Sequence, residues 1–181
     1  MRRLLLALGA LLCAVSTAVT ATPEIEVNVE KRNDTFVIDS SFEASVPVRI
    51  AWRVLTDFDN MARILHNLNA SRILSRNGNT LRVRQEGTAR FGLFSYTFNS
   101  EREIELEPRK RILARQIAGN TKAYTSEMEI APSEHGTRFR YHAEMTLDSG
   151  IARLFGGPFI RHEIAEQFGW MIEEMERRQS P

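Results

Sequence analysis

Five polar residues occupy strand positions whose alternation turns them toward the interior of the protein: Gln85, Tyr96, Tyr124, Ser126 and Tyr141. They share these faces with apolar residues spaced by two, which is the period of a half-buried β-strand. A mostly apolar pocket with a few hydrogen-bonding groups is the usual composition of a small-molecule site. In the alternative interpretation, each tyrosine packs its ring in the core and hydrogen-bonds its hydroxyl group to backbone or water.

A cyclase or dehydratase could use such a tyrosine or glutamine to polarise a carbonyl group of its substrate. Proton abstraction also needs a base whose pKa lies near neutrality. No histidine, glutamate or aspartate stands out among the positions expected to face inward. The sequence therefore favours a binding protein over an enzyme, and we assign no catalytic residue.

The spacing of other reactive residues disfavours metal and hydrolase chemistry. The histidines His66, His135, His142 and His162 show no short metal-ligand spacing. No Gly-x-Ser-x-Gly motif marks a hydrolase nucleophile. We therefore expect neither a metal ion nor a cofactor.

The elements that would position the five polar residues are mostly strands. Alternation and turn signals predict strands over residues 36–44, 71–76, 81–90, 94–106, 111–118, 122–130 and 138–147. Asn77-Gly78 between two of them is the strongest short-range signal for a β-hairpin. We expect these strands to form one curved antiparallel sheet of about seven strands.

Two short helices are expected after the first strand. Ser45 and Pro47 are typical of a helix start, and Val48, Ala51, Trp52 and Leu55 follow at helical spacing. Asp59 can cap a second short helix that reaches Leu65.

A long helix should close the chain, with Gly156-Gly157-Pro158 at its entrance and its end near Arg178. One apolar stripe runs along it: Ile160, Ile164, Phe168, Ile172 and Met175. Arg161, Glu163 and Glu166 are expected to face water. The glycines and their apolar neighbours could gate a cavity mouth together with the loop at residues 91–93, or they could simply relieve crowding in a tight connection.

A curved sheet covered by one helix leaves space that side chains must fill, so this α+β architecture predicts a cavity for an apolar molecule. The residues expected to contact that molecule are Gln85, Phe94, Tyr96, Phe98, Tyr124, Ser126, Met128, Tyr141, Met145, Phe155, Phe159, Ile164 and Phe168.

The N-terminus has the layout of a secretory signal peptide. Arg2 and Arg3 precede an apolar run over residues 4–15, and small residues follow up to Ala21. We expect cleavage after Ala21, with Ala18 as the alternative site, and a periplasmic or secreted product. A retained N-terminal anchor is the less favoured interpretation, because the apolar run is short for a bilayer span.

Removing residues 1–21 leaves a mature chain without cysteine and with 22 basic against 23 acidic residues. Disulfides and thiol chemistry are thereby excluded for the mature chain. Nucleic-acid binders usually carry a basic excess, which this chain lacks. We expect residues 22–33 to be a loose leader and residues 34–179 to form one domain.

Residues 46–59 (VPVRIAWRVLTDFD), residues 90–94 (RFGLF) and residues 136–141 (GTRFRY), together with the order of the predicted elements, resemble the START-like helix-grip superfamily. The likeness is strongest to its polyketide cyclase/dehydrase and coenzyme-Q-binding branch. The resemblance implies a cavity between the sheet and the C-terminal helix that holds a lipid, a quinone, a polyketide or a similar molecule.

Three functions from different classes follow. The favoured one is a periplasmic carrier or sensor of a hydrophobic small molecule or lipid, with transient contact to a membrane surface and no nucleic-acid partner. The second is a cyclase/dehydratase-type enzyme that acts on an apolar carbonyl substrate in the same cavity. The third is an interaction module whose cavity is vestigial and whose surface binds a protein or a membrane.

Overall fold

The structure, a computed structural model, describes residues 24–91, 94–147 and 149–180, without the side chains of residues 91, 94 and 149–155. Eight antiparallel strands form a single sheet in the order β1-β2-β8-β7-β6-β5-β4-β3. The strands are β1 (Glu26–Arg32), β2 (Thr35–Ala44), β3 (Leu68–Asn77), β4 (Thr80–Phe91), β5 (Phe94–Glu107), β6 (Arg111–Gly119), β7 (Ala123–Ser133) and β8 (Gly136–Thr146).

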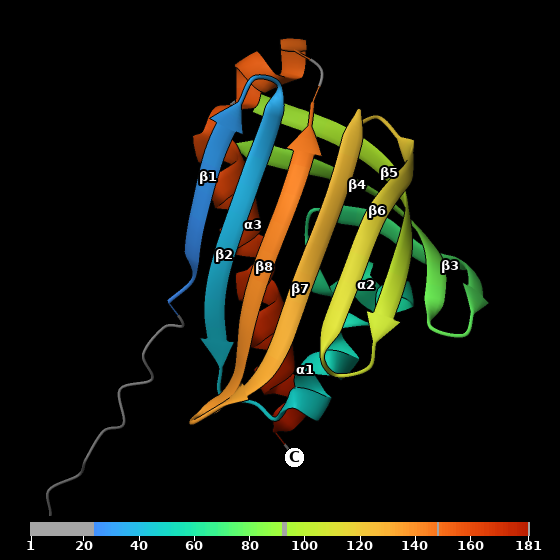
Figure 1. The fold of residues 1–181 in the computed structure, drawn as a ribbon, viewed down its shortest axis with the longest axis vertical. Coiled ribbons are helices and arrows are strands. Elements are labelled where there is room, and N and C mark those ends of the chain that lie inside the picture. The colour runs from blue at the N-terminus through green and yellow to red at the C-terminus, as the bar shows by residue number, and fades with distance from the viewer. Residues whose placement is uncertain (1–23, 92–93, 148, 181) are drawn as a thin grey trace, which may run out of the picture.

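The helices lie on one side of this sheet. The long α3 (Ser149–Gln179) runs behind β2, β8 and β7 in Figure 1, while α1 (Val48–Leu55) and α2 (Met61–Ile64) lie at the lower end. The short 3-10 helix η1 (Phe58–Asn60) joins α1 to α2. This arrangement confirms the predicted helix-grip fold. Within the described residues, no helix has both the length and the apolarity that crossing a membrane requires.

The expected loose leader is wrong for residues 26–32, which form β1, so the sheet has eight strands instead of about seven. β1 pairs with β2 from Glu26 opposite Ser41 to Arg32 opposite Thr35. Val27 and Val29 pack against buried side chains, whereas Asn28 between them and Glu26 and Glu30 on either side are exposed. Two apolar residues at an edge make a weak strand signal, which the neighbouring charges obscured.

The last helix begins earlier than expected and is interrupted where the sequence places its glycines. Gly156 has φ 56° and ψ 179°, which is not a helical conformation. It divides the helix into a short segment that begins at residue 149 and a long segment that follows Gly156. This backbone conformation is essentially restricted to glycine. Pro158 then lies in the first turn of the long segment, as the sequence predicts.

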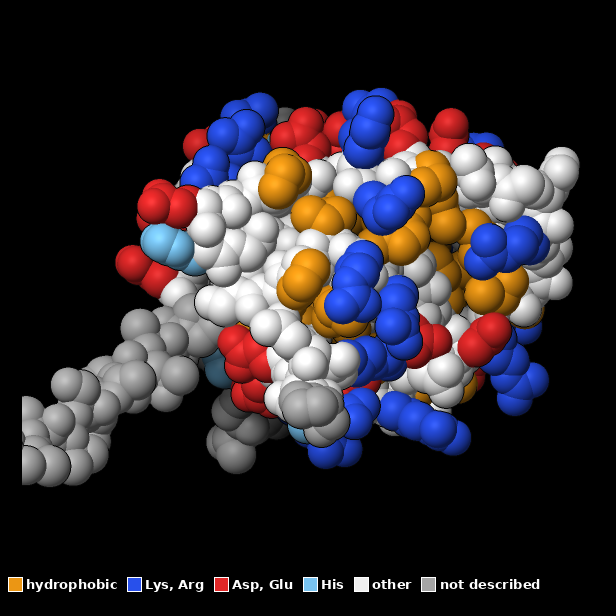
Figure 2. Space-filling view, turned by 90° about the horizontal axis from the view of Figure 1, so that it is seen from below, with side chains coloured by type: hydrophobic (Ala, Val, Ile, Leu, Met, Phe, Trp, Pro, Cys, Tyr) orange, Lys and Arg blue, Asp and Glu red, His pale blue; other side chains and the backbone are white. Residues whose placement is uncertain are grey.

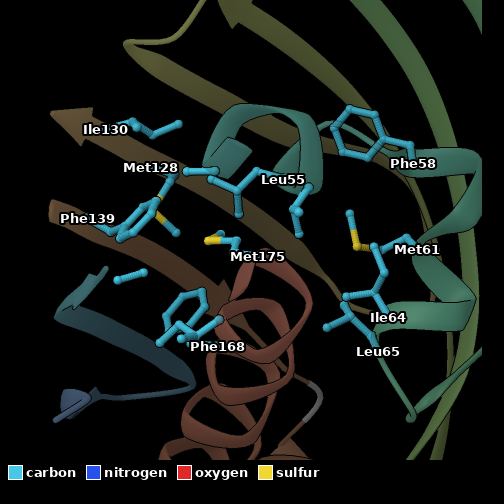
Figure 3. Close-up of a cluster of buried hydrophobic side chains, with 14 of the residues drawn as sticks. Leu55, Phe58, Met61, Ile64, Leu65, Met128, Ile130, Phe139, Phe168 and Met175 are labelled. Atoms are coloured by element: carbon cyan, nitrogen blue, oxygen red, sulfur yellow. The ribbon is translucent and has the colours of Figure 1, made fainter. Parts of the chain in front are cut away.

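The core fills the space between the sheet, α1 and the C-terminal part of α3. Figure 3 shows Phe168 and Met175 of α3 facing Met128 and Phe139 of the sheet. The ring of Phe42 stacks on that of Phe139 with 4.6 Å between the centroids and lies 4.6 Å from that of Phe168. Aromatic pairs of this kind stabilise a core beyond the area that they bury.

The outer face of the sheet carries ion pairs between neighbouring strands. Glu101 of β5 accepts from Arg84 of β4 at 3.1 Å, and Arg111 of β6 reaches Glu127 of β7 at 3.0 Å. Arg138 of β8 lies 2.7 Å from Glu43 of β2. Each exposed pair contributes little, about 0–1 kcal/mol, but cross-strand partners of opposite charge favour this register.

Candidate functional site

Two adjoining cavities lie between the sheet and α3. Each has a volume of ≈ 160 Å³. Both are lined by the same central residues: Asn67, Phe98, Arg102, Tyr124, Tyr141, Ile164 and Gln167. Because these residues form the wall of both cavities, we treat the two as one interior site with two arms.

The first arm lies toward the kink of α3, and the second lies toward α1 and α2. Predicted ligand-binding residues in the wall of the first arm are Tyr96, Phe98, Tyr124, Tyr141, Met145, Phe159 and Ile164. Those in the wall of the second arm are Gln85, Phe98, Tyr124, Ser126, Met128, Tyr141, Ile164 and Phe168. The side chains of Phe94 and Phe155 lie outside the described residues. Contact of any of these side chains with a ligand stays a prediction.

Two of the predicted tyrosines form a pair at the junction of the arms. The hydroxyl groups of Tyr124 on β7 and Tyr141 on β8 are 2.8 Å apart, and either can donate the hydrogen bond. Burial raises the pKa of Tyr141 well above 10, and the neighbouring Tyr124 raises it further. The Tyr141 hydroxyl group is therefore neutral near pH 7, and a tyrosine hydroxyl group can both donate and accept a hydrogen bond.

Arg102 of β5 is a cavity residue that the sequence analysis missed. Its guanidinium carbon lies 4.4 Å from the centroid of the Tyr124 ring, a cation–π contact. Its Nε is buried and has no hydrogen-bond partner among the residues that the structure describes. The strand alternation that turns Tyr96 and Phe98 inward also turns Ser100 and Arg102 inward, so the signal was present in the sequence.

Glu163 of α3 is a second missed residue, and the expectation that it faces water is wrong. Its side chain is only 7% exposed and lines the first arm. Asn67 Nδ2 donates a hydrogen bond to its Oε2 at 3.0 Å, and the backbone N–H of Arg90 also donates to it. Burial raises the pKa of Glu163 above 4.5, and the nearby Glu166 carboxylate adds to this. Glu163 lies beside Ile160 and Ile164 on α3, so the inward-facing side of this helix is one position wider than the apolar stripe.

Asn67 reaches the cavity because the backbone around it packs closely on β4. Its carbonyl oxygen accepts a hydrogen bond from the Thr88 N–H at 2.8 Å. A Cβ atom at Gly87 would lie 2.3 Å from that same oxygen, so only glycine allows this approach. Gly87 thereby fixes the position from which the Asn67 side chain reaches Glu163.

The site therefore joins apolar walls to a small set of polar groups. A guanidinium group, two hydrogen-bonded phenols and a carboxyl group with a raised pKa share the interior. Such a site can hold an apolar molecule and orient its oxygen atoms. Among the described residues, no group of three or more histidine, cysteine, aspartate and glutamate side chains could hold a metal ion.

Comparison with known proteins adds a family and a fold. The sequence model of a family described as "Polyketide cyclase / dehydrase and lipid transport" matches residues 35–178. No curated protein matches the chain.

Several solved structures share the fold at low sequence identity. The Zhui aromatase/cyclase from a Streptomyces species is 15% identical, with a TM-score of 0.66 over 81% of this chain and 96% of that one. TTHA0849 from Thermus thermophilus is 14% identical, with a TM-score of 0.68 over 81% of this chain and 99% of that one. A STAR-related lipid transfer protein from Xanthomonas axonopodis is 10% identical, with a TM-score of 0.63 over 88% and 97%.

Proposed function

Since this chain belongs to the polyketide cyclase/dehydrase and lipid transport family, we propose that it binds and carries a hydrophobic small molecule between its sheet and α3. The observation that carries this proposal is the two-armed interior cavity, whose wall is mostly apolar and whose polar groups gather where the arms meet. Apolar walls supply affinity, while a few fixed donors orient the ligand. The lipid transfer protein and the aromatase/cyclase with the same fold agree with this kind of ligand.

A cavity-filling substitution tests this proposal. Ala89 is buried and lines the first arm, so Ala89→Leu should occupy space that the ligand needs. We expect affinity for a fluorescent fatty-acid probe to fall about tenfold or more, with little change in the midpoint of urea unfolding. Ala118→Leu, at an exposed position of β6, is the matched control and should bind as wild type does. Equal affinity in all three proteins would place the probe outside the cavity and contradict the proposal.

The second candidate function is a cyclase/dehydratase-type enzyme, and Glu163 is the observation that favours it. A buried carboxyl group with a raised pKa can give or take a proton, and Arg102 can stabilise an oxyanion in the same cavity. Loss of water from an aromatic β-hydroxyketone, followed as absorbance of the enone product, would test this. Turnover that Glu163→Gln abolishes would favour the enzyme, whereas binding without turnover at any pH would favour the carrier.

We propose further that the mature protein is exported to the periplasm or secreted. The support is the order of charged, apolar and small residues over positions 1–21. β1 begins at Glu26, so cleavage after Ala21 would leave every strand intact. Intact-mass measurement of the exported protein should give a chain that starts at Thr22, and a product that keeps residues 1–21 would contradict this.

A transient contact with anionic membranes is also proposed for the lower end of the molecule. Figure 2 shows basic side chains around apolar ones at this end. α1 exposes Arg49 and Arg53. β3 exposes Arg72 and Leu74, whose side chain is 43% exposed. Sedimentation with vesicles should detect binding to phosphatidylglycerol membranes that high salt removes, and equal binding to neutral phosphatidylcholine vesicles would contradict the charge-based contact.

A further inference from the structure

The side-chain amide of Asn67 is hydrogen-bonded at its nitrogen, whereas its oxygen lacks a partner among the described residues. Its Nδ2 donates to Glu163 Oε2 at 3.0 Å, while its Oδ1 is buried and has no hydrogen-bond partner within the part of the chain that the structure describes. Asn67 is 9% exposed and lines both arms of the cavity. A buried acceptor without a donor is unfavourable, so the site is incomplete until a molecule in the cavity supplies one.

Glu163 decides which end of the amide faces the cavity. An ionised carboxylate can only accept hydrogen bonds, so it holds the Asn67 NH₂ group and leaves the oxygen turned away from it. The backbone N–H of Arg90 also donates to Glu163, which agrees with a group that acts as an acceptor. The orientation of the amide thus follows from the hydrogen-bond network around it.

We propose that Asn67 selects ligands that carry a hydroxyl group, by accepting a hydrogen bond from that group at Oδ1. This inference rests on the proposed binding function and specifies the chemistry of the bound molecule. The same cavity offers two buried groups without hydrogen-bond partners in the described chain, the Nε of Arg102 and the hydroxyl of Ser100. These can donate to a second oxygen, so the ligand that satisfies the site is an apolar alcohol or phenol with a further oxygen acceptor.

The selection depends on the proton of Glu163. When Glu163 is protonated, its O–H can donate to Asn67 Oδ1, and the amide then turns its NH₂ group toward the cavity. The ligand preference of the site then changes from molecules with a hydroxyl donor to molecules with a carbonyl acceptor. Burial raises the pKa of Glu163, as does Glu166, while Asn67, the Arg90 N–H and His162 act in the opposite direction. Across the cavity the facing charged group is Arg102.

Three naphthalene probes of similar shape separate these cases: 2-naphthol, 2-methylnaphthalene and 2-acetylnaphthalene. Their dissociation constants are measured by displacement of a fluorescent fatty acid from the full mature chain. The readout is the ratio of the dissociation constants of two probes for the same protein. A loss of affinity that affects both probes equally cancels in this ratio. For each protein we take the dissociation constant of 2-methylnaphthalene divided by that of 2-naphthol. At a pH of about 8, this ratio should be about tenfold larger for wild type than for Asn67→Leu.

The carboxyl variants test the proton dependence. Lowering the pH in steps through the folded-state pKa of Glu163, which burial raises, should shift the preference of wild type toward 2-acetylnaphthalene. Glu163→Gln should lose this pH dependence, because its amide can donate or accept at any pH. Glu166→Gln makes the same chemical change three residues along α3, outside the cavity wall. It should keep the pH-dependent change in preference, with the midpoint at lower pH, because the Glu166 carboxylate no longer raises the pKa of Glu163.

An unchanged 2-naphthol to 2-methylnaphthalene ratio in Asn67→Leu would overturn the assignment of Asn67, even while both probes bind. Persistence of the pH shift in Glu163→Gln would overturn the role of Glu163. Failure of all three naphthalenes to displace a bound fatty acid would overturn this inference alone. Failure of the fluorescent fatty acid itself to bind wild type would contradict the proposed binding function.

Discussion

Glu163 and Tyr141 depart from their ordinary pKa values because the cavity removes both side chains from water. For each of them burial raises the pKa, which disfavours the charged form. The protonation states of Glu163 and Tyr141 thus depend on their surroundings as much as on their residue types. The guanidinium group of Arg102 lies in the same space and faces the ring of Tyr124.

The raised pKa of Glu163 makes a prediction about stability. The folded protein binds this proton more tightly than the unfolded chain does, so the stabilisation is present at low pH and is lost as the pH rises through the folded-state pKa. We expect Glu163→Gln to be more stable than wild type above that pKa, with a difference that shrinks toward pH 4.5. Urea unfolding of both proteins at a series of pH values measures it. A constant difference across the series would contradict the burial of this carboxyl group.

Phe168 tests the packing between α3 and the sheet. Its side chain is 5% exposed and makes a T-shaped contact with the Tyr141 ring, with 5.2 Å between the centroids. Phe168→Ala should lower the free energy of unfolding by about 3–5 kcal/mol. Leu74→Ala, at a side chain that is 43% exposed, is the control and should stay within about 0.5 kcal/mol of wild type. A loss below about 1 kcal/mol for Phe168→Ala would mean that the ring does not pack in the core as described.

At the scale of elements, the kink in α3 depends on one glycine and not on its neighbour. Gly156 has φ 56°, whereas a Cβ atom at Gly157 would come no closer than 3.8 Å to Val29. Gly156→Ala should cost about 1–3 kcal/mol of unfolding free energy, and Gly157→Ala should be neutral or slightly stabilising. Thermal unfolding measures the stability of the two variants. Equal losses of stability would show that the backbone conformation of the kink does not require glycine at position 156.

The edge of the sheet offers a second prediction at this scale. Arg72 of β3 lies directly opposite Arg84 of β4, so two like charges face each other on neighbouring strands. Arg72→Glu should raise the free energy of unfolding by about 0.2–1 kcal/mol, and about 1 M salt should remove the gain. Arg76→Glu, on the same strand but opposite Leu81, is the matched control. No gain at low salt would indicate that the two arginine side chains point away from each other.

The sequence predicted the elements well where their periodicity was strong. The strands from β2 to β8, both short helices and the buried stripe of α3 follow from alternation and helical spacing. β1 was missed because an edge strand needs only two inward apolar residues, and charged residues surround them. Arg102 and Glu163 were missed because charged residues were expected to face water, although the strand and helix periods placed both on inward faces.

At the scale of the whole molecule, the polar cluster of the site could not be predicted from any single element. Asn67 follows α2, Arg102 belongs to β5, the two tyrosines come from β7 and β8, and Glu163 comes from α3. Only the curvature of the sheet around α3 brings them together. The cavity itself was predicted from the architecture, because one helix cannot fill the concave face of a long sheet.

Native mass spectrometry of the protein purified from its own compartment tests the central claim most directly. We predict a complex with one apolar molecule that carries a hydroxyl group, released by organic solvent and then identified by its mass and fragments. The Ala89→Leu variant should carry less of it, and Ala118→Leu should carry as much as wild type. A protein that shows only the mass of the bare chain, under conditions that preserve its complex with an added fatty-acid probe, would contradict the claim that the cavity carries a ligand.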